Sequence, residues 1–499
     1  MDTPSDPSKI SSSLSWERWV ARRWWCFIAL PMLVLGLIFA LVPLARAGPY
    51  YLPVSGSDPY GYGWLMMLMF IPYAVGIVAL MRSGESPSRR AIWVMFTIVT
   101  IPFVIAPLMQ SHDAFEYLFY AKMQLAHGAN PYLTPPSAFS GDSWFRSIGW
   151  PEQVSVYGPL WTHLVAGTVA ATGQRIGLSL LALKGLAGGA TALALLGLLT
   201  LRGDGNDGID PAGTIAGVAF AFNPLVLAAG ALSGHPDVFL AACFVGAMVA
   251  EQHRRRWLAA LMLIVAVLIK AYAVFPLVIY LVVLIRRRDL RALVISTSIG
   301  VVLASVAYAP YWAGFQTLLG TLRVGSLTSV SLAGSVQEAL AIALRWLGAS
   351  DPAAVAASAV RMLSATLIGA TLILVCRTTR TLREPWRAAA ICLAVVFLVT
   401  PWYLPWYSVG LFVLALPLRD RTLGAPVGLF TATSFIQVPG AAHLIQSVLR
   451  YGPPLWLYRR GSRLPATRRA GEHRGPRGNP CRPFLTLRAR RASIPRSPP

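Results

Sequence analysis

Apolar runs long enough to cross a membrane dominate this sequence, and they constrain its fold more than any other feature. Runs of about 15–25 apolar residues recur from residue 25 to residue 449, and a transmembrane helix needs about 20. In lipid only helices and closed barrels satisfy every backbone group, and these runs lack the period-two alternation of barrel strands. Only 13% of the residues are charged, against about 25% in soluble domains. The sequence therefore predicts an all-α, polytopic bundle of about 11–13 transmembrane helices.

The net charge of +23 suggests nucleic acid, but its location argues against that partner. Twelve arginines lie in 459–499, which is rich in Pro and Gly and is predicted to be a disordered basic tail. Most other basic residues form short clusters between apolar runs, where they set topology. We therefore predict a cytoplasmic segment over 1–24, a transmembrane domain over 25–458 in contact with lipid, and the tail. The first run, 25–44, exceeds a signal-peptide core of about 7–15 residues and is predicted to be retained.

The basic clusters also predict which loops face outward. Arginines in 16–23 place the N-terminus in the cytoplasm of a multi-pass cell-membrane protein. Long outside loops are then expected at 110–157 and 311–356, carrying amphipathic helices. The stretch 257–285 is too long for one upright span at 1.5 Å per residue. It is predicted to form a hairpin of two short helices with Lys270 at its outer end. Between 158 and 235 the sequence fits either four crossings or a partly embedded 158–173.

Two carboxylates open the first outside loop. Asp113 and Glu116 are three residues apart, so on a helix they share one face. Carboxylates at the membrane rim can serve as a general base or hold a metal ion; the alternative is that Asp113 caps the helix that follows. The five cysteines have no metal-type spacing, so no metal site is assigned and a divalent metal requirement stays open.

A second set of charged residues lies within or next to apolar runs. His235 and Asp237 lie between two apolar helices, and Lys270 lies inside one. Intramembrane ionisable residues usually have a function, and a lysine can act as a point charge for phosphate. The alternatives are an Asp237 helix cap, a His235 hydrogen-bonded in its loop, and a Lys270 that reaches lipid phosphate. Arg323, in the second outside loop, either supports the same anion or is simply solvated.

Turn motifs and aromatic residues complete the set of candidates. Asn130-Pro131-Tyr132 and Tyr157-Gly158-Pro159 are typical turn sequences, which is an ordinary structural role. Trp402 and Tyr403 belong to a group of four aromatics at a helix end. An interfacial aromatic belt explains such residues, and so does stacking on a sugar or an isoprenoid chain.

In series, these motifs resemble the GT-C superfamily of glycosyltransferases, which use polyprenyl-phosphate sugars. The likeness is closest to polyprenol-phosphate-mannose-dependent mannosyltransferases of actinobacterial envelopes, and more distant to the catalytic subunit of GPI mannosyltransferase I. It covers roughly 90–420 and rests on seven motifs in order. The motifs are Asp113 with a Tyr-rich helix, Gly128 to Tyr132, Tyr157 to Leu160, Asn223-Pro224, Gly234 to Asp237, Lys270 to Tyr272 with Pro276, and Pro401 to Tyr403.

The resemblance implies an inverting transfer of a hexose, with mannose favoured, to a glycan or glycolipid acceptor on the extracytoplasmic face. Asp113 takes the family's catalytic position, with Glu116 as its neighbour. Lys270, His235 and Arg323 would bind the donor phosphate. The implied substrate-binding residues are Asn130, Tyr132, Tyr157, Asp237, Tyr272, Trp402 and Tyr403. His112 before Asp113, and Phe115 where distant relatives have a second acid, depart from the family pattern and leave the metal and acceptor open. The competing functions are a transporter or lipid flippase, and a non-catalytic envelope scaffold.

Overall fold

The chain forms a bundle of helices, which confirms the predicted all-α fold. The computed structural model describes residues 16–47, 59–108, 111–201, 211–323, 328–329, 331–379, 384–418, 421–436 and 443–462. Within these ranges the only β-type pairing is an isolated bridge between Ala313 and Phe315. The prediction for the tail from residue 463 onward, and for the first 15 residues, lies outside the described part of the chain.

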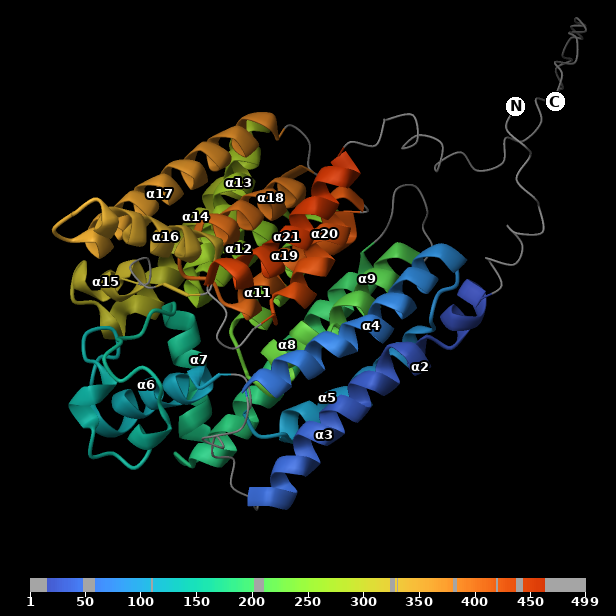
Figure 1. Cartoon of the computed structure of the whole chain (residues 1–499), viewed down its shortest axis with the longest axis horizontal. Coiled ribbons are helices and arrows are strands. Elements are labelled where there is room, and N and C mark those ends of the chain that lie inside the picture. The colour runs from blue at the N-terminus through green and yellow to red at the C-terminus, as the bar shows by residue number, and fades with distance from the viewer. Residues whose placement is uncertain are drawn as a thin grey trace, which may run out of the picture.

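One group of helices contains most of the N-terminal half (Figure 1). Its members are α2 (Trp24–Phe27), α3 (Ala29–Ala47), α4 (Pro59–Ser83), α5 (Arg89–Ile105), α8 (Ile176–Thr200) and α9 (Pro211–Ala221). Two contacts show that α5 and α8 run antiparallel: Arg89 at the start of α5 donates to the Leu199 carbonyl at 2.7 Å. At the other end, the buried Lys184 of α8 donates to the Ala106 carbonyl just after α5. The segment that leads to Asp113 therefore leaves the bundle beside the first half of α8.

The undecided region between 158 and 235 contains a bent span. Gly213–Ala221 and Pro224–Leu232 are together long and apolar enough to cross a membrane, with a bend of 53° between them. The break falls at Asn223, whose side chain accepts from the backbone N–H groups of Leu225 and Val226 and so caps α10 (Pro224–Leu227). A π-helical turn, η3 (Ala228–Leu232), follows and delivers the chain to His235. By length, α8 and this bent pair supply two crossings, and α7 (Pro159–Ala171) is too short for a third.

The second group of helices begins with α11 (Asp237–Gln252), which packs against α8 of the first group as well as α12 and α19. The predicted hairpin is confirmed: α12 (Arg256–Ile269) and α13 (Val274–Arg286) meet at Lys270 and the turn η4 (Ala271–Ala273). The remaining elements are α14 (Leu290–Tyr308), η5 (Ala309–Tyr311), α16 (Leu332–Trp346), α17 (Pro352–Thr378), α18 (Glu384–Val399), η7 (Pro405–Tyr407), α19 (Ser408–Ala415), η8 (Leu416–Leu418), α20 (Arg421–Thr433) and α21 (His443–Ser462).

Long segments form a cap, here residues 111–171 and 309–323, at one end of the bundle (Figure 1). It contains α6 (Asp113–His127), η1 (Pro136–Phe139), η2 (Phe145–Ser147), α7 and α15 (Gln316–Arg323). Asn130 Nδ2 donates to the Tyr311 carbonyl at 2.8 Å, which ties its two parts together. Asp142 accepts from Lys122 at 2.6 Å and lies 3.0 Å from His127, which fixes the η1–η2 loop on α6.

Gly158 joins the cap to the Lys270 hairpin. Its backbone N–H donates to the Ile269 carbonyl at 2.9 Å. A Cβ at this position would lie 2.1 Å from the Leu268 carbonyl oxygen, which no side chain tolerates. Glycine is therefore required here by close approach of two backbones, and this contact brings Tyr157 next to Lys270.

Among the described residues, five helices are long and apolar enough to cross a membrane, and the bent pair makes a sixth. Shorter apolar helices, including both arms of the hairpin, accompany them. The protein is thus a polytopic helical membrane protein. The full number of spans stays a prediction.

Candidate active site

A small pocket lies where the cap meets the second helix group. Its volume is ≈ 60 Å³. Its walls come from α6, from the segment 150–157 of the cap and from the turn at 402–407. The lining residues are Asp113, Glu116, Tyr120, Trp150, Gln153, Val154, Val156, Tyr157, Trp402, Leu404 and Tyr407. The structure thus brings together four residues predicted from sequence, Asp113, Glu116, Tyr157 and Trp402.

Asp113 is the first residue of α6 and its side chain is almost fully buried. The N-cap is His112, and no side chain caps the helix, so the interpretation of Asp113 as a capping residue is wrong. Its backbone N–H donates to Ser111 Oγ at 3.0 Å. Burial raises the pKa of Asp113, while the Ser111 side chain, the Trp150 indole and the nearby positive charge of Lys270 act in the opposite direction. A carboxyl group with a raised pKa is a better proton acceptor at neutral pH than an exposed one.

Glu116 lies one helical turn further along the same face of α6. Its Oε1 accepts from the backbone N–H groups of Gly149 and Trp150, at 2.5 Å each. Its Oε2 is buried and has no hydrogen-bond partner in the described part of the structure. Burial raises the pKa of Glu116 to about 7, against the lowering effect of the two N–H donors. One oxygen of Glu116 therefore holds the loop that carries Trp150, and the other remains unpaired.

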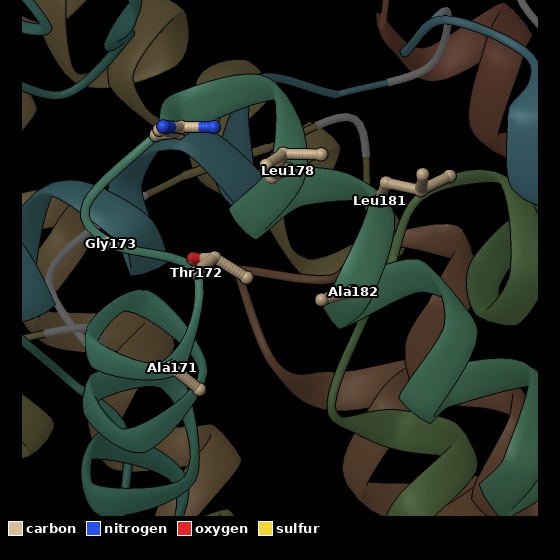
Figure 2. Close-up of a pocket in the computed structure, with 7 residues that line it drawn as sticks. Ala171, Thr172, Gly173, Leu178, Leu181 and Ala182 are labelled. Carbon is tan, nitrogen blue, oxygen red and sulfur yellow. The ribbon is translucent and has the colours of Figure 1, made fainter.

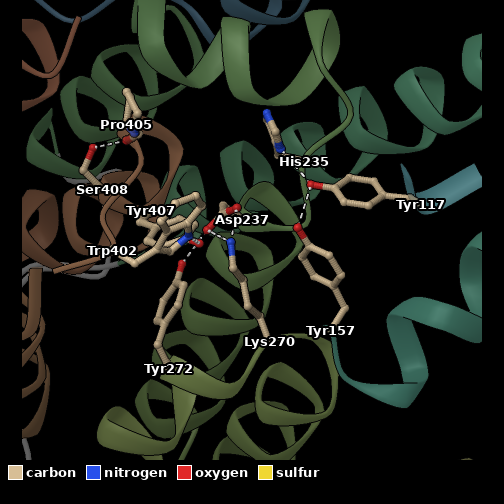
Figure 3. A network of polar contacts seen from close by, with 10 residues as sticks. All are labelled: Tyr117, Tyr157, His235, Asp237, Lys270, Tyr272, Trp402, Pro405, Tyr407 and Ser408. Atoms are coloured by element: carbon tan, nitrogen blue, oxygen red, sulfur yellow. Dashed lines mark hydrogen bonds and ion pairs between the residues drawn. The ribbon is translucent and has the colours of Figure 1, made fainter. Parts of the chain in front are cut away.

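An ion pair lies beneath the pocket (Figure 3). Lys270 Nζ lies 3.0 Å from Asp237 Oδ1 and 2.8 Å from Oδ2, and Oδ1 also accepts from the Tyr272 hydroxyl at 2.8 Å. The ammonium is 3.9 Å from the centre of the Tyr407 ring, which lines the pocket. Asp237 is therefore engaged by Lys270 and Tyr272 and makes no side-chain cap on α11. The Lys270 ammonium is thus held next to the pocket by Asp237, which balances its charge.

A chain of hydroxyl groups runs from the pocket to His235. The Tyr157 hydroxyl donates to the Tyr117 hydroxyl at 3.3 Å, which lies 3.0 Å from His235 Nδ1. The imidazole is fully buried and stacks on Trp406, with ring centres 4.0 Å apart. In Figure 3 the far end of the ring points away from Lys270. The position of His235 suits it to hold Tyr117 and Tyr157.

Eight predicted residues do not line the pocket. Lys270, His235, Asp237 and Tyr272 form the network beside it, and four others lie elsewhere. Asn130 binds the Tyr311 carbonyl, and the buried Tyr132 hydroxyl lies 2.8 Å from Thr162 Oγ1, so both hold the cap together. Tyr403 is buried, with its hydroxyl 2.9 Å from Ser434 Oγ. Arg323 is the last residue of α15, and the position of its side chain is not described.

Sequence reasoning missed several lining residues, of which Trp150 and Tyr407 matter most. Trp150 lies in an irregular loop with no periodicity, so nothing in the sequence marked it. Tyr407 belongs to the same aromatic group as Trp402, which was the one signal that could have found it. Its hydroxyl accepts from Trp402 Nε1 at 3.2 Å.

Two further features bear on ligands. Within the described ranges, no group of three or more His, Cys, Asp or Glu side chains is arranged to hold a metal ion. A wider hollow of ≈ 620 Å³ lies at the turn between α7 and α8 (Figure 2). Arg175 is the only charged residue among those that line it, and no carboxylate does. None of its lining residues can therefore serve as a general base.

Fold and site together define a polytopic helical membrane protein with a buried acidic pocket, walled by aromatic rings, above a buried lysine. Residues 60–286 match the family model described as alpha-(1->6)-mannopyranosyltransferase, N-terminal domain. This match confirms the resemblance to mannosyltransferases and supports a mannosyltransferase activity, which takes mannose from a sugar donor to a glycan acceptor. No curated protein and no solved structure matches the chain. The matched range includes Asp113, Asp237 and Lys270 and ends before Trp402 and Tyr407.

Proposed function

We propose that this protein transfers mannose from a polyprenyl-phosphate donor to a glycan or glycolipid acceptor, with inversion, at the extracytoplasmic face of the cell membrane. The observation that carries the proposal is the pairing of two buried groups of opposite charge around one pocket. Asp113 lines its wall and Lys270 lies behind the Tyr407 ring at its floor. A base for the acceptor hydroxyl and a cation for the departing phosphate are the two groups that such a sugar transfer requires.

In the proposed reaction, Asp113 removes the proton from an acceptor hydroxyl as that oxygen attacks the anomeric carbon of mannose. The new bond joins the acceptor oxygen to the anomeric carbon, and the bond from that carbon to the phosphate oxygen breaks. Its electron pair leaves with polyprenyl phosphate, whose negative charge Lys270 stabilises. Stabilisation of a developing anion commonly contributes more to an enzyme's rate enhancement than any other single effect. The name of the matched family specifies an α-linked product, which an inverting transfer would form from a donor of β configuration.

The other predicted residues take supporting roles in this proposal. Tyr157, Tyr272 and Asp237 orient Lys270 and line the donor side, and His235 positions Tyr157 through Tyr117. Arg323 remains a predicted phosphate ligand. Asn130, Tyr132 and Tyr403 hold in place the backbone segments that carry the lining residues. Glu116 acts on Asp113 through the Trp150 loop.

A transporter would favour paired broken helices in two related halves. The described residues contain one bent pair, Gly213–Ala221 with Pro224–Leu232. This one break leads the chain to His235 beside the proposed active site, so the transferase function explains it.

The test is a transfer assay with purified protein in lipid nanodiscs, with radiolabelled polyprenyl-phosphate mannose and a panel of mannoside acceptors. Asp113→Asn should lower the transfer rate by about 10²–10⁴, the usual contribution of a general base, while donor binding persists. Asp351→Asn is the matched control, because Asp351 caps the distant helix α17 and Asn caps equally well. Wild-type rates in Asp113→Asn would exclude Asp113 as the base, and absence of any donor binding by the wild type would overturn the proposed function.

A further inference from the structure

Trp150 connects the two carboxylates of the pocket. Its backbone N–H donates to Glu116, and its side chain lines the pocket together with Asp113, whose pKa the indole lowers. Its ring meets Trp402 edge to face, with centroids 5.7 Å apart and planes at 78°. The two tryptophans come from loops far apart in the sequence and meet across the pocket. Trp150 is 42% exposed, so part of its ring is open to a ligand from solution.

The pocket is too small for its proposed substrates while this contact persists. Its volume is only ≈ 60 Å³. Ligand pockets usually measure about 300–1,000 Å³. An acceptor sugar can therefore reach Asp113 only when the two indole rings part or turn.

The backbones behind the two rings are firmly held. On one side, Glu116 holds the Gly149–Trp150 backbone, and Asp142 accepts from the Trp144 N–H at 2.8 Å. On the other side, Ser329 Oγ donates to the Tyr403 carbonyl at 2.8 Å, and Ser331 Oγ donates to the Pro401 carbonyl at 2.7 Å. Movement is thus left to the side chains, which keeps the two rings opposite one another as they separate.

We propose that Trp150 and Trp402 form the acceptor-sugar subsite, and that Trp150 also positions Asp113 by donating its indole N–H until the acceptor hydroxyl arrives. This inference rests on the proposed transferase function. The ligand class is a pyranoside, whose apolar C–H face lies on an indole ring while its hydroxyl groups meet Asp113 and Gln153. Aromatic rings with one polar atom suit such half-apolar ligands. In the empty site the indole N–H keeps the Asp113 carboxylate hydrogen-bonded, as a buried carboxylate requires.

The first measurement is binding of methyl α-D-mannopyranoside, detected by saturation-transfer NMR on the full-length protein in nanodiscs. Wild type, Trp150→Ala and Trp150→Phe are compared with Trp346→Phe, a matched control at the exposed end of α16. Trp150→Ala should weaken binding about 10-fold, because one aromatic wall is lost. Trp150→Phe keeps a ring and should bind within about threefold of wild type. Unchanged binding in Trp150→Ala would overturn the subsite.

The second measurement is the pH profile of mannose transfer. Trp150→Phe keeps an aromatic ring but removes the N–H donor, so kcat should fall about 10-fold through the loss of one hydrogen bond to a charged group. The acidic limb of the profile should also move to higher pH, since the carboxylate form of Asp113 loses a donor. A fall in kcat without this movement would refute the positioning role.

The two proposals fail in different ways. Mannoside binding that depends on Trp150, without transfer by the wild type, would support the subsite and overturn the transferase function. Transfer with an unchanged acceptor KM in Trp150→Ala would support the transferase function and overturn the subsite.

Discussion

The ion pair between Lys270 and Asp237 allows structure and catalysis to be separated by a double-mutant cycle. Asp237 is fully buried and the Lys270 side chain is only 10% exposed. Each partner satisfies the other's charge, so Asp237→Asn leaves an ammonium without a carboxylate, and Lys270→Met leaves a carboxylate with only the Tyr272 hydroxyl. Either single change should therefore destabilise the fold, whereas the double variant removes both charges together.

The size of the effect follows from the geometry. Two contacts of 2.8 and 3.0 Å in a site closed to water make a well-formed buried pair. Removal of one partner from such a pair costs about 3–5 kcal/mol, and replacement of both by uncharged groups is often nearly neutral. We expect about 3–5 kcal/mol lost in each single variant and about 1 kcal/mol in the double variant. Glu85→Gln, which breaks the exposed pair with Arg22, should cost less than about 1 kcal/mol and is the control.

The assay is unfolding of each variant in detergent, run beside mannose transfer in nanodiscs. The double variant should recover the stability of the wild type and still transfer mannose at least about 100-fold more slowly, because the charge beside the leaving phosphate is gone. A double variant as unstable as the sum of the two singles would show that the pair is not coupled. A stable double variant with the wild-type transfer rate would refute the role given to Lys270.

Three further predictions concern the pocket wall and the cap. Because burial raises the pKa of Asp113, transfer should decline as pH falls through a pKa above the usual aspartate value, and a pH–rate profile of kcat/KM measures this. Glu116, with a pKa of about 7 when folded and about 4.3 when unfolded, keeps its proton longer in the folded state. Stability should therefore fall as pH rises between these values, and Glu116→Gln should reduce that slope in thermal unfolding, whereas an unchanged slope would contradict the assignment. Gly158→Ala, which places a Cβ against the Leu268 carbonyl, should cost more than about 3 kcal/mol and lower the yield of folded protein; wild-type stability would refute the close approach.

The parts predicted correctly from sequence depend on local rules. Apolar run length predicted the helices, because lipid leaves the backbone few alternatives. The hairpin followed from a run too long for one span, and the structure has its break at Lys270. The shared face of Asp113 and Glu116 followed from helical periodicity, and both carboxylates line the pocket.

The parts that sequence could not predict depend on contacts between distant segments. Asn130 and Tyr132 belong to a turn motif much like that of Tyr157, yet they bind Tyr311 and Thr162 and do not line the pocket. Only tertiary packing decides which residues of a turn motif face a cavity. Trp150 was missed for the same reason, since its position depends on a backbone bond to Glu116 rather than on any local pattern.

The residues that line the pocket come from two parts of the chain, and these parts have different proposed roles. Asp113, Glu116 and the Lys270–Asp237 pair all lie within the matched residues 60–286, and in the proposed reaction they supply charge and proton transfer. Trp402 and Tyr407 lie beyond that range and supply an aromatic wall that covers the lysine and meets Trp150. The proposed reacting groups thus lie in the matched part of the chain, and the part that follows completes the wall that the proposed acceptor would contact. Substitution of Trp402 can therefore change acceptor preference, whereas substitution of Tyr407 would also remove the ring that covers the Lys270 ammonium.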